Sequence, residues 1–256
     1  MNTKTFFSLL VVAALGVAMV GCDDTKLEVY PTTFYRLSEE TLLQKRDDFA
    51  KRNPYLTTSL NQFGFCDISE SDGAEVASNG SFTKEEAIAA VKDFVARNPE
   101  YTGVKNPNDL RFRVIGGDPF FWYFRTENQI INNTEVDYTE ILFHIKDGTL
   151  ISCYGNYFSN VYIPKKFNFD IEKAKSQLLG KEVIHWGWGG PYSAGIITEE
   201  HLQQSTAKLI IIPVTTDEKI ELRVTWEILL DAPMHYIFDV DVMTGEIIRE
   251  MPTIIS

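Results

Sequence analysis

Residues 140–154 read Glu-Ile-Leu-Phe-His-Ile-Lys-Asp-Gly-Thr-Leu-Ile-Ser-Cys-Tyr. Every second residue from 141 to 145 is apolar, which is the period of a strand with one buried face. Asp147-Gly148 is a typical hairpin turn, so the chain is expected to return as a partner strand over 149–154. This stretch therefore predicts an antiparallel hairpin whose apolar face another element must cover.

A capped helix precedes the hairpin. Thr83-Lys84-Glu85-Glu86 is a capping box, in which Thr83 caps the helix and Glu86 reaches back to its amide. Apolar residues then recur at helical spacing until Asn98-Pro99 ends the helix. Residues 112–115 are expected to form a strand, and the aromatic run 120–124 indicates a strand buried on both faces.

The same pattern returns in the second half of the chain. Asp170 caps a short helix that ends near Gly180, and strands are expected at 208–214, 221–228, 236–240 and 246–249. Asp239 and Asp241 are expected on the solvent-facing side of their strand. Two such units predict an α+β fold of two lobes, each a helix packed on a curved antiparallel sheet.

The first 21 residues have the features of a secretory signal peptide. Lys4 precedes the apolar stretch 6–20, which is shorter than a membrane-spanning helix requires. Met19-Val20-Gly21-Cys22 resembles a bacterial lipobox, which implies that Cys22 carries lipid. Asp23-Asp24 resembles the surface-export signal of Bacteroidetes lipoproteins. We therefore expect a lipid-anchored protein of the bacterial outer membrane, on the periplasmic or the cell-surface side.

Charge and motifs exclude several classes of function. With 24 Lys and Arg against 36 Asp and Glu, the net charge of −12 disfavours nucleic acid as a partner. The chain has no His-Glu-x-x-His, no Gly-x-Ser-x-Gly and no phosphate-binding Gly loop. We therefore expect no catalytic residues, no metal site and no cofactor, and we do not expect an enzyme.

Two groups of residues are candidates for other roles. Cys66 and Cys153 form a possible disulfide outside the cytoplasm, although their spacing does not decide whether they meet. Trp186, Trp188 and Tyr192 lie on a Gly-rich stretch and form a possible ligand platform. The alternative is that these rings fold back onto the core, because apolar exposure is costly.

Three stretches of the chain resemble the paired propeptide of thermolysin-type metallopeptidases and its PepSY domain. The first is the hairpin quoted above, followed by Gly155-Asn156-Tyr157. The second is Ala207-Lys-Leu-Ile-Ile-Ile-Pro213 with Leu222-Arg-Val-Thr-Trp226, and the third is Val240-Asp-Val-Met-Thr-Gly-Glu246. The resemblance implies two cystatin-like lobes in a region that chaperones and inhibits an attached peptidase.

The resemblance implies a division of the chain and a function. Residues 22–80 would form a tether and helical segment, 81–165 a propeptide-like lobe and 166–256 a PepSY-like lobe. No peptidase domain follows the closing hairpin, so we expect a non-catalytic lipoprotein that binds, inhibits or assists a separate secreted metallopeptidase, or binds a peptide. The alternative is a surface lipoprotein that binds glycans or mediates adhesion.

Overall fold

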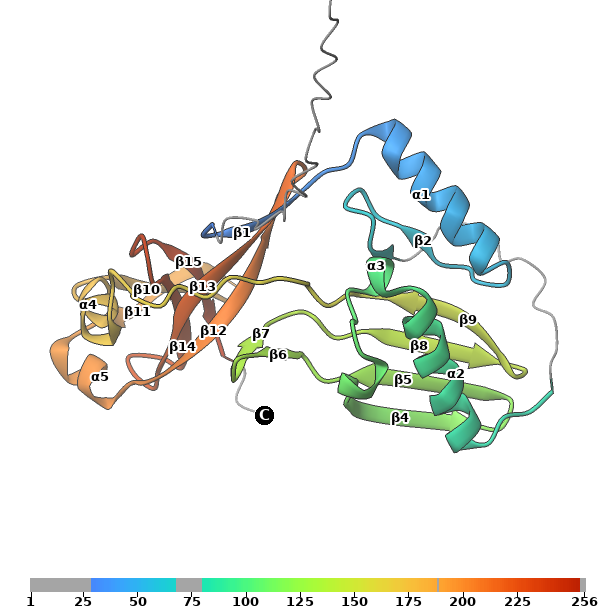
Figure 1. Ribbon diagram of the computed structural model, residues 1–256. Helices are drawn as coiled ribbons and strands as arrows, with labels where there is room; N and C mark the ends of the chain where they lie inside the picture. The colour runs from blue at the N-terminus through green and yellow to red at the C-terminus, as the bar shows by residue number, and fades with distance from the viewer. Residues whose placement is uncertain (1–28, 68–79, 188, 254–256) are drawn as a thin grey trace, which may run out of the picture.

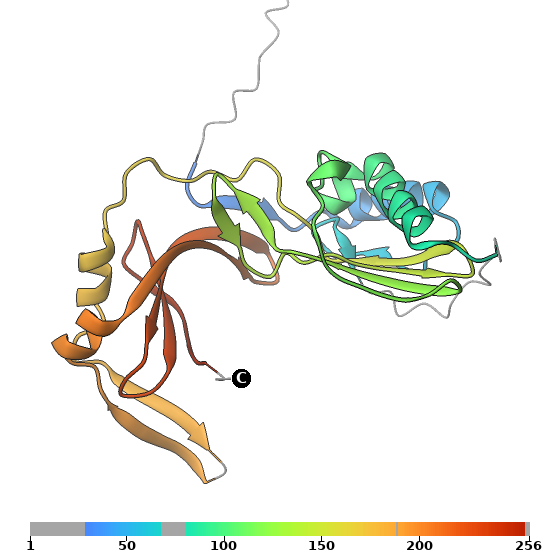
Figure 2. The same ribbon diagram turned by 90° about the horizontal axis from the view of Figure 1, so that it is seen from below.

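The computed structural model describes residues 29–67, 80–187 and 189–253, which form two lobes side by side (Figures 1 and 2). The fold is α+β, as the sequence predicts. All strand pairings of the described chain are antiparallel except one parallel contact between β7 and β12. No described helix is long and apolar enough to cross a membrane.

The first lobe is built on the hairpin at residues 140–154. Its sheet has the order β4-β5-β8-β9, and the strands are Phe112–Asp118, Phe121–Thr126, Leu142–Lys146 and Thr149–Tyr154. Helices α1 (Glu39–Arg52) and α2 (Lys84–Arg97) lie together on one face of this sheet (Figure 2). The capping box at Thr83 is confirmed, and the apolar face of α2 is buried against the sheet.

The two helices of this lobe end at matching asparagines. The Asn53 side-chain amide donates to Phe49 O and to Asn98 Oδ1, at 2.9 and 3.1 Å. The Asn98 side-chain amide in turn donates to Phe94 O and to Asn53 Oδ1, at 2.9 and 3.2 Å. Both side chains are buried, so this reciprocal pair satisfies helix-end carbonyls and locks the two helices together.

Short elements complete the first lobe. Helix α3 (Pro99–Thr102) and a 3₁₀ turn (Pro107–Asp109) follow α2. Strands β2 (Ser59–Leu60) and β3 (Cys66–Asp67) form a small hairpin whose far end lies against β9. This hairpin covers the edge of the sheet that β9 would otherwise leave open.

The second lobe contains a seven-stranded sheet. The main order is β15-β14-β13-β12-β7-β6, and β1 (Thr32–Tyr35) pairs with β13. The other strands are Gln129–Ile131 (β6), Thr134–Val136 (β7), Thr206–Thr215 (β12), Lys219–Leu230 (β13), Tyr236–Asp241 (β14) and Ile247–Pro252 (β15). Strand β1 lies in the predicted segment 22–80, and β6 and β7 lie in the predicted lobe 81–165. All three nevertheless pair in the sheet of the second lobe. The segment boundaries themselves remain a prediction.

One face of the large sheet carries the core of the second lobe. Helices α4 (Ile171–Ser176) and α5 (Glu199–Gln204) pack on it, and the Asp170 cap of α4 is confirmed. The hairpin of β10 (Glu182–Gly187) and β11 (Gly190–Ile196) extends away from the lobe (Figure 2). The waist between the lobes has its own core, in which Phe34, Phe65 and Phe158 contact one another.

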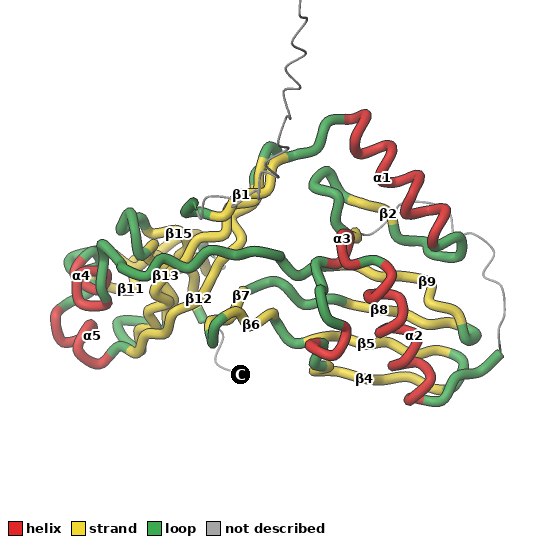
Figure 3. The backbone as a smooth tube through the Cα atoms, viewed as in Figure 1, coloured by secondary structure: helices red, strands yellow, loops and turns green. Residues whose placement is uncertain are grey.

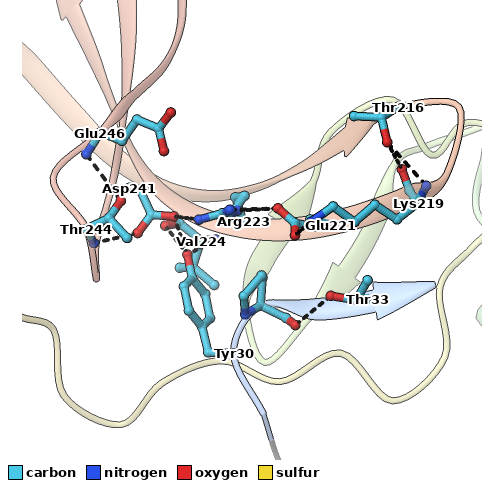
Figure 4. A network of polar contacts seen from close by, with 11 residues as sticks. Tyr30, Thr33, Thr216, Lys219, Glu221, Arg223, Val224, Asp241, Thr244 and Glu246 are labelled. Carbon is cyan, nitrogen blue, oxygen red and sulfur yellow. Dashed lines mark hydrogen bonds and ion pairs between the residues drawn. The ribbon is translucent and has the colours of Figure 1, made fainter. Parts of the chain in front are cut away.

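The opposite face of the large sheet is polar, and its two aspartates are buried. Asp239 and Asp241 are both fully buried, so the expectation that they face solvent is wrong. Asp241 accepts from Tyr30 Oη at 2.6 Å and pairs with Arg223 at 3.3 Å (Figure 4). Period-two alternation places these residues correctly on the non-core face, but it does not show that arginines and Tyr30 cover that face.

Arg249 contacts other carboxylates of this polar face. Its guanidinium pairs with Asp239 and Glu227, donates to Asp137 Oδ2 at 2.8 Å and to Tyr138 Oη at 2.7 Å. β15 and β7 are four strands apart, which in a flat sheet is roughly 19 Å. Arg249 spans this interval because the sheet curls around its polar face, as the long bend of β12 and β13 shows (Figure 2).

Loss of the reciprocal asparagine pair should destabilise the first lobe. Asn98→Ala removes three buried hydrogen bonds and leaves Asn53 Oδ1 and Phe94 O without these donors, so we expect about 2–3 kcal/mol less unfolding free energy in urea. Arg97→Ala is the control, since its exposed pair with Asp93 is worth under about 0.5 kcal/mol. Equal losses in the two variants would contradict the prediction.

Asp239 should make stability depend on pH. Burial raises the pKa of Asp239 from 3.8 to about 6, although Arg249 beside it acts in the opposite direction. The folded state therefore keeps a proton that the unfolded state releases, and this contribution to stability is lost as pH rises from about 4 through 6. Relative to Asp239→Asn, the unfolding free energy of wild type should fall by up to about 3 kcal/mol over this pH range.

Urea unfolding at several pH values between 4 and 7.5 measures this difference. The exposed control Asp217→Asn should keep the wild-type pH dependence. A difference between wild type and Asp239→Asn that does not change with pH would refute the assignment.

Candidate functional site

A groove lies at the waist, between the first lobe and the β6–β7 hairpin. Its volume is about 620 Å³, within the usual range of ligand sites. One wall comes from residues 103–111 of the first lobe, the floor from 157–161, and the opposite wall from β6 and its turn. Figure 3 shows the loops that join the two lobes passing side by side through this region.

The wall formed by β6 is a free strand edge. β6 pairs with β7 on one side and is the terminal strand of the sheet. Asn132 and Asn133 have φ values of 48° and 64°, which is the conformation of a two-residue type I′ turn. Such a turn closes on a hydrogen-bonded pair, Ile131 with Thr134, so the N–H and C=O of Ile130 point away from β7. Ile130 also lines the groove.

The groove is rich in carboxamide side chains. Asn128 and Gln129 are held in place, since Asn128 donates to Glu135 at 2.8 Å and Gln129 bonds both the N–H and the C=O of Phe158 at 2.8 Å. Lys105 donates to Asn160 Oδ1 at 2.7 Å along the opposite wall. The Ile130 side chain is 55% exposed beside these polar groups. A rigid edge with an exposed apolar residue and carboxamide neighbours suits an extended peptide backbone.

A second surface lies on the face of the first-lobe sheet that no described helix covers (Figure 2). Phe121 stacks on His144 with ring centroids 5.8 Å apart, and the ring centroid of Tyr154 lies 5.7 Å from that of His144. Tyr123 lies flat over Gly116, where a Cβ would stand 2.3 Å from its ring. Burial lowers the pKa of His144, so the row is uncharged at neutral pH.

This aromatic row corrects an expectation from the sequence. The run 120–124 was expected to be buried on both faces, yet β5 alternates: Phe121 and Tyr123 are 41% and 42% exposed, whereas Phe124 is buried. Aromatic residues on both faces hide the period of two, so the pattern could not separate core rings from surface rings. The free edge of β6 was not predicted from the sequence, although Asn132-Asn133 after Ile130-Ile131 is a recognisable turn.

The remaining candidate residues are dispersed. Tyr192 on β11 is 53% exposed and contacts His185 edge-on. Trp186 pairs with Pro191 in the β10–β11 hairpin through its backbone, and Trp188 and Cys22 lie outside the described residues. Cys66 and Cys153 are buried in one core as free thiols in contact with each other. Among the candidates whose side chains the structure describes, it brings together the two cysteines.

Comparisons with known proteins add little. No family model and no curated protein matches the chain. One similar solved structure is the YpeB C-terminal domain of Bacillus megaterium, at 13% identity and a TM-score of 0.32. That match covers 85% of this chain and 98% of the other. A likeness at this level supports no argument about the fold or the function of this chain.

Proposed function

We propose that this protein is a non-catalytic, lipid-anchored protein of the bacterial outer membrane that binds a secreted metallopeptidase through the free edge of β6. The single observation that carries the proposal is Ile130, which lines a groove of about 620 Å³ and whose backbone N–H and C=O point away from β7. The outward groups of an edge strand pair with an added strand of a partner. The partner segment would be extended and would lie antiparallel or parallel to β6.

The family resemblance supplies the kind of partner. In thermolysin-type enzymes the corresponding region chaperones and inhibits the attached peptidase, so a separate peptidase is the matching partner here. The PepSY assignment and the cystatin-like form of both lobes belong to this proposal. Two features support it: a helix pair lies on one face of the first-lobe sheet, and antiparallel strands dominate both lobes.

The proposal predicts that a proline at the edge prevents binding. Ile130→Pro removes the outward N–H without breaking a hydrogen bond to β7, so the melting temperature should stay within about 3 °C of wild type. Affinity for the peptidase should fall at least tenfold, because strand addition uses this backbone group. Ile130→Ala is the matched control: it shortens the side chain, keeps the N–H, and should bind within about threefold of wild type.

The probe is the secreted metallopeptidase of the same organism, purified after retention on immobilised residues 23–256. Calorimetry gives the affinity, and hydrolysis of a peptide substrate shows whether the peptidase is inhibited or assisted. Unchanged binding by the folded Ile130→Pro variant would place the interaction elsewhere. Absence of binding by wild type to any secreted peptidase would refute the proposed function.

A second candidate function rests on the aromatic row of the first lobe. Phe121, Tyr123 and His144 present ring faces on a sheet face that no described helix or strand covers (Figure 2). Exposed aromatic groups of this kind mark ligand or protein contacts. A surface glycan that stacks on these rings is the alternative ligand. The stretch with Trp186, Trp188 and Tyr192 remains a separate predicted platform.

Tyr123→Ala tests the glycan alternative. If sugars stack on the row, the variant should lose at least tenfold in affinity for neutral oligosaccharides in calorimetry, with little change in melting temperature. Tyr35→Ala is the matched control, since Tyr35 is 71% exposed on another strand. Equal binding by wild type and Tyr123→Ala, or no binding by either, would exclude the row as a glycan site.

A further inference from the structure

Three hydrogen bonds hold the segment 57–67 against the edge of the first-lobe sheet, two between backbone groups and one to a threonine hydroxyl. Thr57 N donates to Ile151 O at 2.8 Å, and Cys153 N donates to Thr58 Oγ1 at 2.8 Å. Gly155 N donates to Cys66 O at 3.2 Å. These bonds set β3 alongside the end of β9, so the side chains of both strands share one core.

Cys66 and Cys153 meet at this seam. Their exposed fractions are 2% and 0%, and both belong to the core that includes Phe49 and Phe94. The two thiols are in hydrogen-bond contact, and burial together with this contact raises the pKa of the Cys153 thiol. A thiol pair this close and this well fixed by backbone hydrogen bonds on both sides needs little movement to become covalent.

We propose that Cys66 and Cys153 form a disulfide bond in the exported protein. This inference rests on the proposed location in the cell envelope, where disulfides form and persist. Because both thiols are buried in the folded protein, the bond forms while the chain folds, before β3 closes over β9.

The oxidant is a disulfide compound, either a thiol–disulfide oxidoreductase of the envelope or a small disulfide. One cysteine thiolate attacks a sulfur of the oxidant, a mixed disulfide forms, and one thiol of the oxidant leaves. The second cysteine thiolate attacks the mixed disulfide, which releases the second thiol. The protein thus gives up two electrons and two protons, and the oxidant disulfide becomes two thiols.

The bond would join an N-terminal block, α1 with the β2–β3 hairpin, covalently to the sheet of the first lobe. The β2–β3 hairpin carries α1 with it, since Arg46 on α1 donates to Leu60 O at 2.6 Å. In sequence, α1 follows β1, which pairs with β13 of the second lobe. The disulfide would therefore keep this block docked on the first-lobe sheet, and it would close a loop between positions 66 and 153, which are 87 residues apart.

The soluble chain 23–256 gives a direct test, because Cys66 and Cys153 are its only cysteines. Refolding with oxidised glutathione should yield a protein lighter by two hydrogens, with a cross-linked peptide pair in a non-reducing digest. Alkylation in denaturant should modify neither cysteine until a reductant is added. Reduction should lower the melting temperature by roughly 10 °C. The same digest is applied to the full chain isolated from the envelope.

The double variant Cys66→Ala/Cys153→Ala is the control, and reductant should not change its melting temperature. Failure of the pair to link on oxidative refolding would overturn the proposal on geometric grounds. A third outcome is that the pair links in vitro and yet both thiols are free in envelope protein that carries lipid at Cys22. That result would overturn the proposal for the exported protein. Absence of the protein from the envelope would instead refute the proposed location.

Discussion

The ion pairs of Arg249 hold together the part of the molecule on which the rest depends. A single guanidinium joins the edge strand β15, the central strands β13 and β14 and the segment that follows β7. The sheet must curl for these partners to meet, and the curl turns one face inward with its carboxylates. Asp239 consequently loses water, which raises its pKa to about 6 despite the adjacent positive charge.

The same contacts also position the waist. Asp137 and Tyr138 follow β7 and lead back to the first lobe, so Arg249 fixes the crossing segment as well as the sheet. On the other face, Phe34, Phe65 and Phe158 bring together three distant parts of the chain. The β6–β7 hairpin is therefore held from both faces, and its outer edge stays free along the groove. A rigid free edge is more useful for binding an extended segment than a mobile loop, because less ordering entropy is lost on binding.

The two lobes differ in how polar groups are satisfied. The first lobe buries two neutral amides that satisfy each other and the helix-end carbonyls, which involves no charge. The second lobe buries carboxylates that require arginine partners, and removal of one partner leaves an uncompensated charge. The pH dependence that Asp239 gives to stability therefore belongs to the second lobe. The proposed disulfide lies in the first lobe, at the seam with the N-terminal block.

The sequence by itself determined the local elements and the fold class. The Asp147-Gly148 hairpin, the Thr83 capping box and the Asp170 cap lie where the pattern places them, because caps and tight turns depend on neighbouring residues. Only the tertiary structure decided which strands share a sheet, that Asp239 is buried and that Tyr123 is exposed. It also decided that Cys66 meets Cys153 and that the edge of β6 is free. These features depend on residues far apart in the chain, and the period of a strand gives its two faces without saying what covers either one.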